Sequence, residues 1–389
     1  MDKLLWGKHM DFSLTEEQEM VRRMSHEFAD EVISPRAEEM ERSGVVPYDI
    51  IDRMADLGMM GIPYPEKYGG SAGDWVSQML CVEEISRGDV TLGTLLDVTS
   101  IVCEELYKFG LEEQKQRWLV PLAQGKEIGA FGLTEPEAGS DAGATRTTAV
   151  LAMDEWVING IKQFISNIGY KNASIAVITA RSGTRKDGKS LINTFIVPKG
   201  TPGFIVSEPE DKLGWRSFLT CGLFFQDCRI PRGYILGEEG RGFAQHLEVL
   251  QTGRIFVAAI SVGLAQACFD AALAYAKERV QFGQPIYNFQ GISFKLADMA
   301  MAIELSRLMY LKAAWLKDKD LPHTLEASYA KLFASEMAEK TASDALQIHG
   351  GYGYMNNYAV SRYYKFSKLL QIVEGTSEVQ RIVISRNLQ

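Results

Sequence analysis

The spacing of apolar residues changes twice along the chain, and this limits the folds that it can adopt. From about Thr15 to Leu122 apolar residues recur every three or four positions, as on one face of a helix. From about Gly129 to Leu236 the pattern becomes that of strands, with alternation in 175–179. After Gly240 the helical period returns in long stretches. This order predicts an α+β multidomain protein.

The length supports several cores. A chain of 389 residues, 46% of them hydrophobic, is too long for one simple core. Proline and glycine in 61–70 interrupt the first helical zone. We predict an N-terminal helical domain over 1–128, a middle β-barrel-like domain over 129–238 and a C-terminal four-helix bundle over 239–389.

Composition excludes several classes of protein. The net charge is −9 and Lys and Arg are not clustered, so no nucleic-acid partner is predicted. Apolar runs such as 255–264 are too short to cross a bilayer, so no membrane insertion is predicted. Five scattered cysteines indicate reduced thiols and no metal site. The start has no signal or transit pattern, which predicts a cytoplasmic protein; residues 1–9 are a native lead or an added segment.

The segment around Glu374 is the strongest candidate for chemistry. Its carboxylate stands between Val373 and Gly375, and a carboxylate in apolar surroundings has a raised pKa and accepts protons near neutral pH. The same residues also suit a plain helix start, because Thr376 and Ser377 are good N-caps. The segment alone leaves both interpretations open.

Five segments in order resemble the acyl-CoA dehydrogenase family of flavoproteins, and the resemblance covers nearly the whole chain. They are Phe131–Asp141, Lys162–Asn167, Arg279–Gly283, Gln347–Gly353 and Ile372–Arg381. The resemblance implies FAD as cofactor, acyl-CoA as substrate, electron-transfer flavoprotein as redox partner and a homo-oligomer, with a homotetramer expected.

The resemblance also implies roles for particular residues. The flavin ring would be contacted by residues of the first two segments: Phe131, Leu133, Thr134, Phe164 and Ser166. Ser140 would lie on both the cofactor and the acyl-CoA side. The diphosphate and adenosine would be bound across a subunit interface by Arg279, Phe282, Gln290, Gln347, Gly350 and Gly351, and Thr376 and Glu378 complete the cofactor set. Without the resemblance, these residues suit surface turns, core strand positions, a solvated helix charge and a helix C-cap.

The implied reaction is α,β-dehydrogenation. Glu374 would remove the α-proton of the thioester, whose carbonyl accepts hydrogen bonds from the Glu374 backbone N–H and a flavin ribityl hydroxyl. The β-hydride would pass to the flavin, giving a 2-enoyl-CoA. Val373, Gly375, Gln251 and Arg254 would contact the acyl-CoA.

The residue at position 253 indicates which branch of the family the chain resembles. In isovaleryl-like and long-chain-like relatives the base comes from a position that matches Gly253, which cannot act as a base. The chain therefore resembles the branch that handles short, medium, branched or cyclic acyl groups. Arg254 matches a family arginine, but Gln251 stands where many relatives have a carboxylate, so the partner of Arg254 stays open.

Asp97 is an acid between Leu96 and Val98, in the region that lines the far end of the acyl pocket in relatives. A buried acid is costly unless it is paired or functional. It would pair with Arg254, cap a helix end, recognise a polar or cationic acyl substituent, or act as a second base on a cyclic acyl chain. No cation lies in 92–100, which disfavours glutaryl-CoA.

Other functions remain. Within the family they are the enoyl-CoA reductase direction, an acyl-carrier-protein dehydrogenase, or an oxidase, which the chain length disfavours. Outside it, the chain would be a non-catalytic flavin- or CoA-binding protein.

Overall fold

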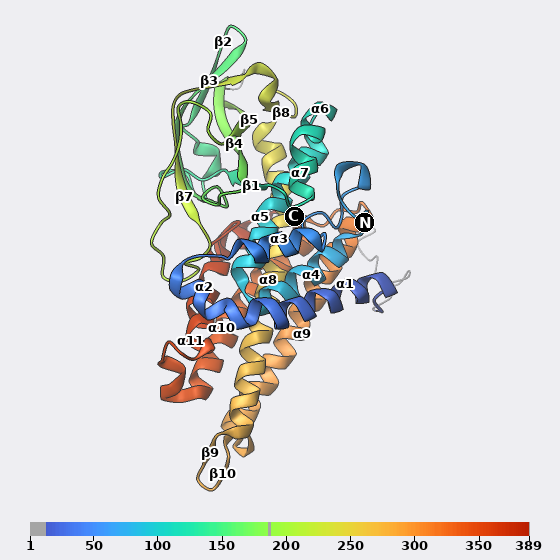
Figure 1. The fold of residues 1–389 in the computed structure, drawn as a ribbon, viewed down its shortest axis with the longest axis vertical. Helices are drawn as coiled ribbons and strands as arrows, with labels where there is room; N and C mark the ends of the chain where they lie inside the picture. The colour runs from blue at the N-terminus through green and yellow to red at the C-terminus, as the bar shows by residue number, and fades with distance from the viewer. Residues whose placement is uncertain (1–12, 186–187, 389) are drawn as a thin grey trace.

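The computed structural model describes residues 13–185 and 188–388, and its chain forms helices, then a sheet, then long helices (Figure 1). The predicted α+β organisation is therefore confirmed. The segment 1–9, for which two origins were considered, lies outside the described residues.

The N-terminal helices pack around two buried members, α4 and α5. Aspartate caps begin both: Asp74 accepts from the backbone of α4, and Asp89 from the backbone of α5. Most residues of α5 are buried, because the helix lies between the sheet and the C-terminal bundle. The helices are α1 (Glu16–Phe28), α2 (Ala37–Ser43), α3 (Tyr48–Asp56), α4 (Trp75–Gly88), α5 (Val90–Phe109), α6 (Glu112–Gln114) and α7 (Val120–Ala123).

The middle region is one eight-stranded sheet with its own apolar core. The strand order is β6-β7-β3-β2-β4-β5-β8, and β1 pairs with β4 in parallel. Long antiparallel pairs β3–β7 and β4–β5 dominate it. The strands are β1 (Ile128–Gly132), β2 (Thr148–Ala152), β3 (Glu155–Ser166), β4 (Ala173–Thr184), β5 (Ser190–Pro198), β6 (Phe204–Val206), β7 (Thr220–Pro231) and β8 (Ile235–Leu236).

The C-terminal bundle is built on α8, whose 37 residues span about 55 Å. By length and composition α8 could cross a membrane, which the short apolar runs did not suggest, but 78% of its most apolar window is buried, as in a core helix. The elements are α8 (Gly242–Glu278), β9 (Val280–Gln281), β10 (Gln284–Pro285), α9 (Gln290–Asp318), α10 (Thr324–His349), α11 (Ala359–Ser367) and α12 (Ser377–Arg386).

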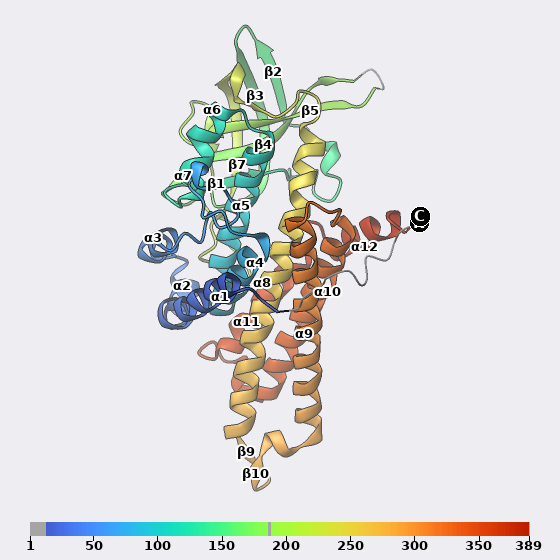
Figure 2. The ribbon, with the colours of Figure 1, turned by 90° about the vertical axis from the view of Figure 1, so that its right-hand side faces the viewer.

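Two features of the fold position the site. Figure 2 shows α8 running from the sheet at one end to the β9–β10 hairpin at the other. At the sheet end, the Asn167 amide nitrogen donates to the Leu95 carbonyl at 3.3 Å, to the Thr99 hydroxyl at 3.2 Å and to the Gly129 carbonyl at 3.2 Å. The end of β3 is thereby fixed against α5 on both sides of Asp97.

Candidate active site

Glu374 lies in a left-handed turn between the last 3₁₀ turn and α12. Its φ is +52° and that of Gly375 is +92°, a region in which a non-glycine residue is strained. The Gln380 amide donates to both carbonyls of the turn, at 3.1 and 2.9 Å, and the Lys331 ammonium donates to the Gly375 carbonyl at 2.9 Å. Thr376 caps α12. The segment is thus a helix start and also a turn that directs an acid inward.

The Glu374 carboxyl is pressed against α8. Its Oε2 is buried, and no group of the described residues donates a hydrogen bond to it. A Cβ added at Gly253 would lie 1.9 Å from this oxygen and 2.8 Å from Ile101. Position 253 must therefore be glycine for Glu374 to occupy this place.

Asp97 reaches the same place from α5. It is 1% exposed, its Oδ1 is buried, and its carboxyl is hydrogen-bonded to that of Glu374. The partner of Asp97 is therefore Glu374 and not Arg254, which was one expectation. Arg254 donates to the Ser328 hydroxyl at 3.3 Å, and Gln251 accepts from Thr324 at 2.7 Å.

The surroundings of Glu374 bring its pKa close to neutral pH. Burial raises its pKa to about 7, and the Asp97 hydrogen bond and the charges of Lys331 and Arg254 oppose the rise. Burial and then the neighbouring Glu374 charge raise the pKa of Asp97 well above its usual range. Such an acid is matched to proton removal at neutral pH.

The residues expected at the flavin ring come together at the end of the sheet nearest α5. The Thr134 carbonyl accepts from the backbone N–H of Gln163 at 2.9 Å, and the Leu133 carbonyl accepts from Lys162 at 3.0 Å. These bonds join the segment after β1 to β3. The first and second sequence segments therefore form one local surface.

Two side chains of β3 define that surface. Phe164 is 63% exposed and has a φ of +60° where β3 is irregular against β7. The Ser166 hydroxyl lies 3.3 Å from that of Thr220. Phe131 instead stacks on His246 of α8, with ring centroids 3.7 Å apart. Ser140 is exposed. Phe164 is thus a surface aromatic and not a core strand residue.

The residues expected at the diphosphate lie elsewhere, beside the β9–β10 hairpin. Arg279, Gly350 and Gly351 line a hollow of about 520 Å³. The Arg279 guanidinium lies 5.6 Å from the centre of the Tyr352 ring, and a Cβ added at either glycine would meet no atom within 4 Å. The other lining residues are Tyr275, Gln281, Ile286, Ile348, His349 and Met355.

Four further predicted cofactor residues are exposed. Phe282 is 94% exposed at the hairpin, and Gln290, Gln347 and Glu378 are also exposed. Phe282 contacts only the edge of the Phe289 ring among the aromatic pairs of the described residues. These side chains are free to meet another molecule.

The two groups of cofactor residues lie in different parts of the chain. The ring surface adjoins α5 at the end of β3, whereas Arg279 is the C-cap of α8, beside the β9–β10 hairpin. Figure 2 shows the β9–β10 hairpin at the end of α8 that lies away from the sheet.

Both groups fit parts of a flavin dinucleotide. An exposed aromatic and small polar side chains suit a flat ring, and a guanidinium beside open glycine backbone suits a diphosphate. The site residues are therefore compatible with FAD.

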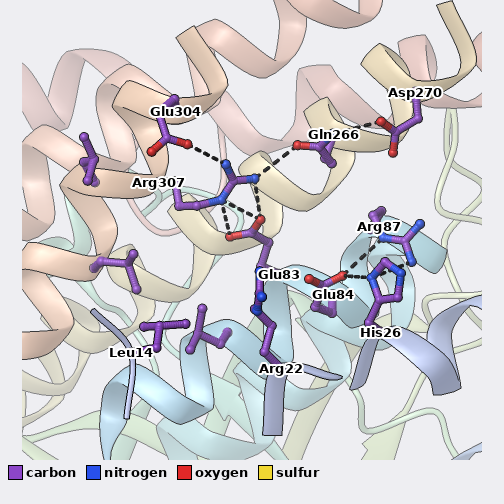
Figure 3. A pocket seen from close by; sticks show the side chains of 13 residues that line it. Leu14, Arg22, His26, Glu83, Glu84, Arg87, Gln266, Asp270, Glu304 and Arg307 are labelled. Atoms are coloured by element: carbon purple, nitrogen blue, oxygen red, sulfur yellow. Dashed lines mark hydrogen bonds and ion pairs between the residues drawn. The ribbon is translucent and has the colours of Figure 1, made fainter. Parts of the chain in front are cut away.

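A second hollow, of about 790 Å³, lies between α1, α4, α8 and α9 (Figure 3). Its charges satisfy one another: Arg307 pairs with Glu83 at 2.7 Å, and Glu84 binds both Arg87 and His26. This hollow contains none of the predicted site residues.

Sequence reasoning missed the residues that support the base. Lys331 and Gln380 hold the turn, Asn167 fixes the sheet against α5, and His246 supports Phe131. The sequence offered a signal for Lys331, because this lysine interrupts an apolar helical stretch. In the structure its side chain is fully buried. The sequence offered no signal for Gln380, because a glutamine one turn into a helix is ordinary.

Comparison with known proteins decides the family. Three domain descriptions match in order: acyl-CoA dehydrogenase N-terminal domain over 15–126, middle domain over 130–228 and C-terminal domain over 240–389. The chain belongs to the acyl-CoA dehydrogenase family. It is an oxidoreductase, and members of the family are FAD-dependent flavoproteins.

Individual relatives match over almost their full length. A protein named probable acyl-CoA dehydrogenase YngJ, from Bacillus subtilis (strain 168), is 52% identical over 97% of this chain and 100% of its own. The structure of butyryl-CoA dehydrogenase from Megasphaera elsdenii has a TM-score of 0.94 and 42% identity, covering 97% of this chain and 100% of that one.

A third relative belongs to the structure named "Electron transferring flavoprotein of Acidaminococcus fermentans: Towards a mechanism of flavin-based electron bifurcation". Its chain has a TM-score of 0.93 and 44% identity, covering 97% of this chain and 99% of that one. These likenesses confirm the acyl-CoA dehydrogenase fold and acyl-CoA dehydrogenation as the class of reaction.

Proposed function

We propose that this acyl-CoA dehydrogenase oxidises a short, branched or cyclic acyl-CoA to its 2-enoyl-CoA, with Glu374 as the base. The observation that carries the proposal is the buried Glu374 carboxyl, which a strained turn holds in place. Burial raises the pKa of this carboxyl to about 7. A small acyl group is supported by the butyryl-CoA dehydrogenase likeness and by Asp97 and Ile101, which approach the base from α5.

In this mechanism the chain's own residues bind the thioester and move one proton. The Glu374 backbone N–H would donate to the thioester carbonyl and stabilise the negative charge that develops there. The Glu374 carboxylate would take the α-proton. Lys331 and Gln380 hold the turn, so the base does not have to be ordered during the reaction. FAD, when bound, supplies the acceptor for the β-hydride.

The cofactor would be shared between two copies of the chain. The ring surface at Phe164 lies beside α5 and the hollow at Arg279 lies beside the β9–β10 hairpin, and the family resemblance implies that the diphosphate segments bind across a subunit interface. This supports a homodimer as the smallest active unit and a homotetramer as a pair of dimers. We also propose a cytoplasmic location, and electron-transfer flavoprotein as electron acceptor on the likeness to the third relative.

The test is anaerobic flavin bleaching by straight, branched, cyclic and dicarboxylic acyl-CoAs, with wild type and Glu374→Gln. Rapid bleaching by one class, lost in the variant, would support both substrate and base. Bleaching that survives in Glu374→Gln would remove Glu374 as base. No bleaching by any thioester would instead favour a carrier-protein substrate or the reductase direction.

A further inference from the structure

Two acids meet at the base without a cation between them. The carboxyl of Asp97 lies within hydrogen-bonding reach of that of Glu374, and each carries a buried oxygen with no other partner among the described residues. A carboxylate has only acceptor atoms, so two ionised carboxylates cannot form a hydrogen bond. One proton must therefore lie between them.

The surroundings of the pair bring the two carboxyls together from α5 and from the turn before α12. Asp97 is 1% exposed on α5, and α5 is fixed to the sheet by Asn167 on both sides of this residue. On the other side, the space at Gly253 is filled by the Glu374 carboxyl. Asp97 is therefore held in the interior, and the Glu374 carboxyl lies in the space that Gly253 leaves open.

The charged groups around the pair indicate which acid holds the proton. Arg254 on α8 and Lys331 on α10 both act on the charge of Glu374, whereas among the charged groups of the described residues only Glu374 acts on Asp97. A negative charge is better stabilised near two cations than near none. The charge therefore belongs on Glu374 and the proton on Asp97.

We propose that Asp97 is a positioning residue for the base: its neutral carboxyl donates a hydrogen bond to the Glu374 carboxylate and keeps that carboxylate ionised and correctly oriented. Asp97 does not take the substrate proton. After α-proton transfer both acids are neutral, and the second proton must leave before the next turnover. This inference rests on the proposed role of Glu374.

The proposal is tested first by infrared spectroscopy of the holoenzyme at mildly alkaline pH. A protonated carboxyl band is expected in wild type and is absent in Asp97→Asn. Asp318 is a matched control, since burial raises its pKa to about 6, so it is ionised under these conditions and Asp318→Asn leaves the band unchanged. A band that persists in Asp97→Asn would overturn the proposal, whatever the fate of Glu374 as base.

The second readout is the pH profile of flavin bleaching. Asn keeps a neutral donor, so the acid limb of Asp97→Asn stays within a few tenths of a pH unit of wild type. Asp97→Leu removes the donor, and its acid limb moves to higher pH by about one unit. If Asp97 were ionised, Asp97→Asn would instead move the limb to lower pH, and the proposal would fail.

If Asp97→Leu does not fold, the infrared band and the pH profile of bleaching by Asp97→Asn still show whether Asp97 is neutral or ionised. Failure of the proposed base is separate from failure of this inference, because it is seen as bleaching that survives in Glu374→Gln. In that variant the Asp97 band should shift in frequency, since its anionic acceptor is gone.

Discussion

Two buried glutamates in this chain have opposite properties. Burial raises the pKa of both, but Glu135 also binds Lys162 at 2.8 Å, the Thr145 hydroxyl and the backbone N–H of Arg146, which together hold its pKa at about 2. Glu374 has one hydrogen bond to its carboxyl and two cations that act only through their charge, and its pKa is about 7.

The difference teaches that burial alone does not make a base. A buried carboxylate that is fully hydrogen-bonded is an anchor, whereas one that is left with an unpaired oxygen is ready to accept a proton. Glu135 joins the segment after β1 to β3, and Glu374 keeps one buried oxygen without a partner. The two can be compared by substitution.

The largest expected effect is on the activity of Glu374→Gln. Removing a general base lowers the rate by about 10²- to 10⁴-fold. Glutamine fills the same volume, so thermal stability should be equal to or above that of wild type. Stopped-flow bleaching and a thermal unfolding scan of the same sample measure both quantities; a large loss of stability would contradict the comparison.

Glu135→Gln should show the opposite pattern. It leaves the buried Lys162 ammonium without its anion, and breaking a buried pair in this way costs about 3–5 kcal/mol. Denaturant unfolding measures the loss. Arg229→Gln is a matched control, because its pair with Glu155 is half-exposed and contributes little.

The two acids should also change stability with pH in opposite senses. The folded-state pKa of Glu374 is raised, so its contribution is present below its unfolded pKa, near 4.5, and is lost as pH rises through about 7. That of Glu135 is lowered, so its contribution is present above 4.5 and is lost as pH falls through about 2.

The expected change is up to about 3 kcal/mol in each window. Unfolding free energies of wild type, Glu374→Gln and Glu135→Gln across the pH range measure it. If the dependence of the unfolding free energy on pH were lost in the same pH range for both variants, the two acids would not differ as described.

The smallest expected effect is that of Lys331→Met. Methionine keeps the buried stem but removes the ammonium that donates to the Gly375 carbonyl and acts on Glu374. Gln380 still donates to that carbonyl, so the turn should persist. The acid limb of bleaching should move to higher pH by up to about one unit. Lys340→Met, on the exposed face of α10, should leave the limb unchanged.

Much of the fold could be predicted from the sequence, because its signals are local. The change of apolar period marks the sheet between two helical regions, and Thr376 marks the start of α12. The inward direction of Glu374 was also predictable, since an acid between aliphatic residues suggests an apolar setting.

The contacts of the site could not be predicted in the same way. Asp97, Gly253, Lys331 and Glu374 come from four segments that are far apart in the sequence, and their meeting depends on how α5, α8 and α10 pack. The sequence singles out the acid at 97 but does not indicate its partner. Which side chain fills a given space is a property of the packed core and not of any local pattern.

The bare backbone at Gly253 limits how this enzyme can evolve. Any side chain there would occupy the place of the Glu374 carboxyl, since even a Cβ would lie 1.9 Å from Oε2. A lineage that moved its base from one position to the other could not pass through a form that carries both acids in place. The exchange would need the Glu374 carboxyl to leave this space before, or at the same time as, a carboxyl at position 253 entered it.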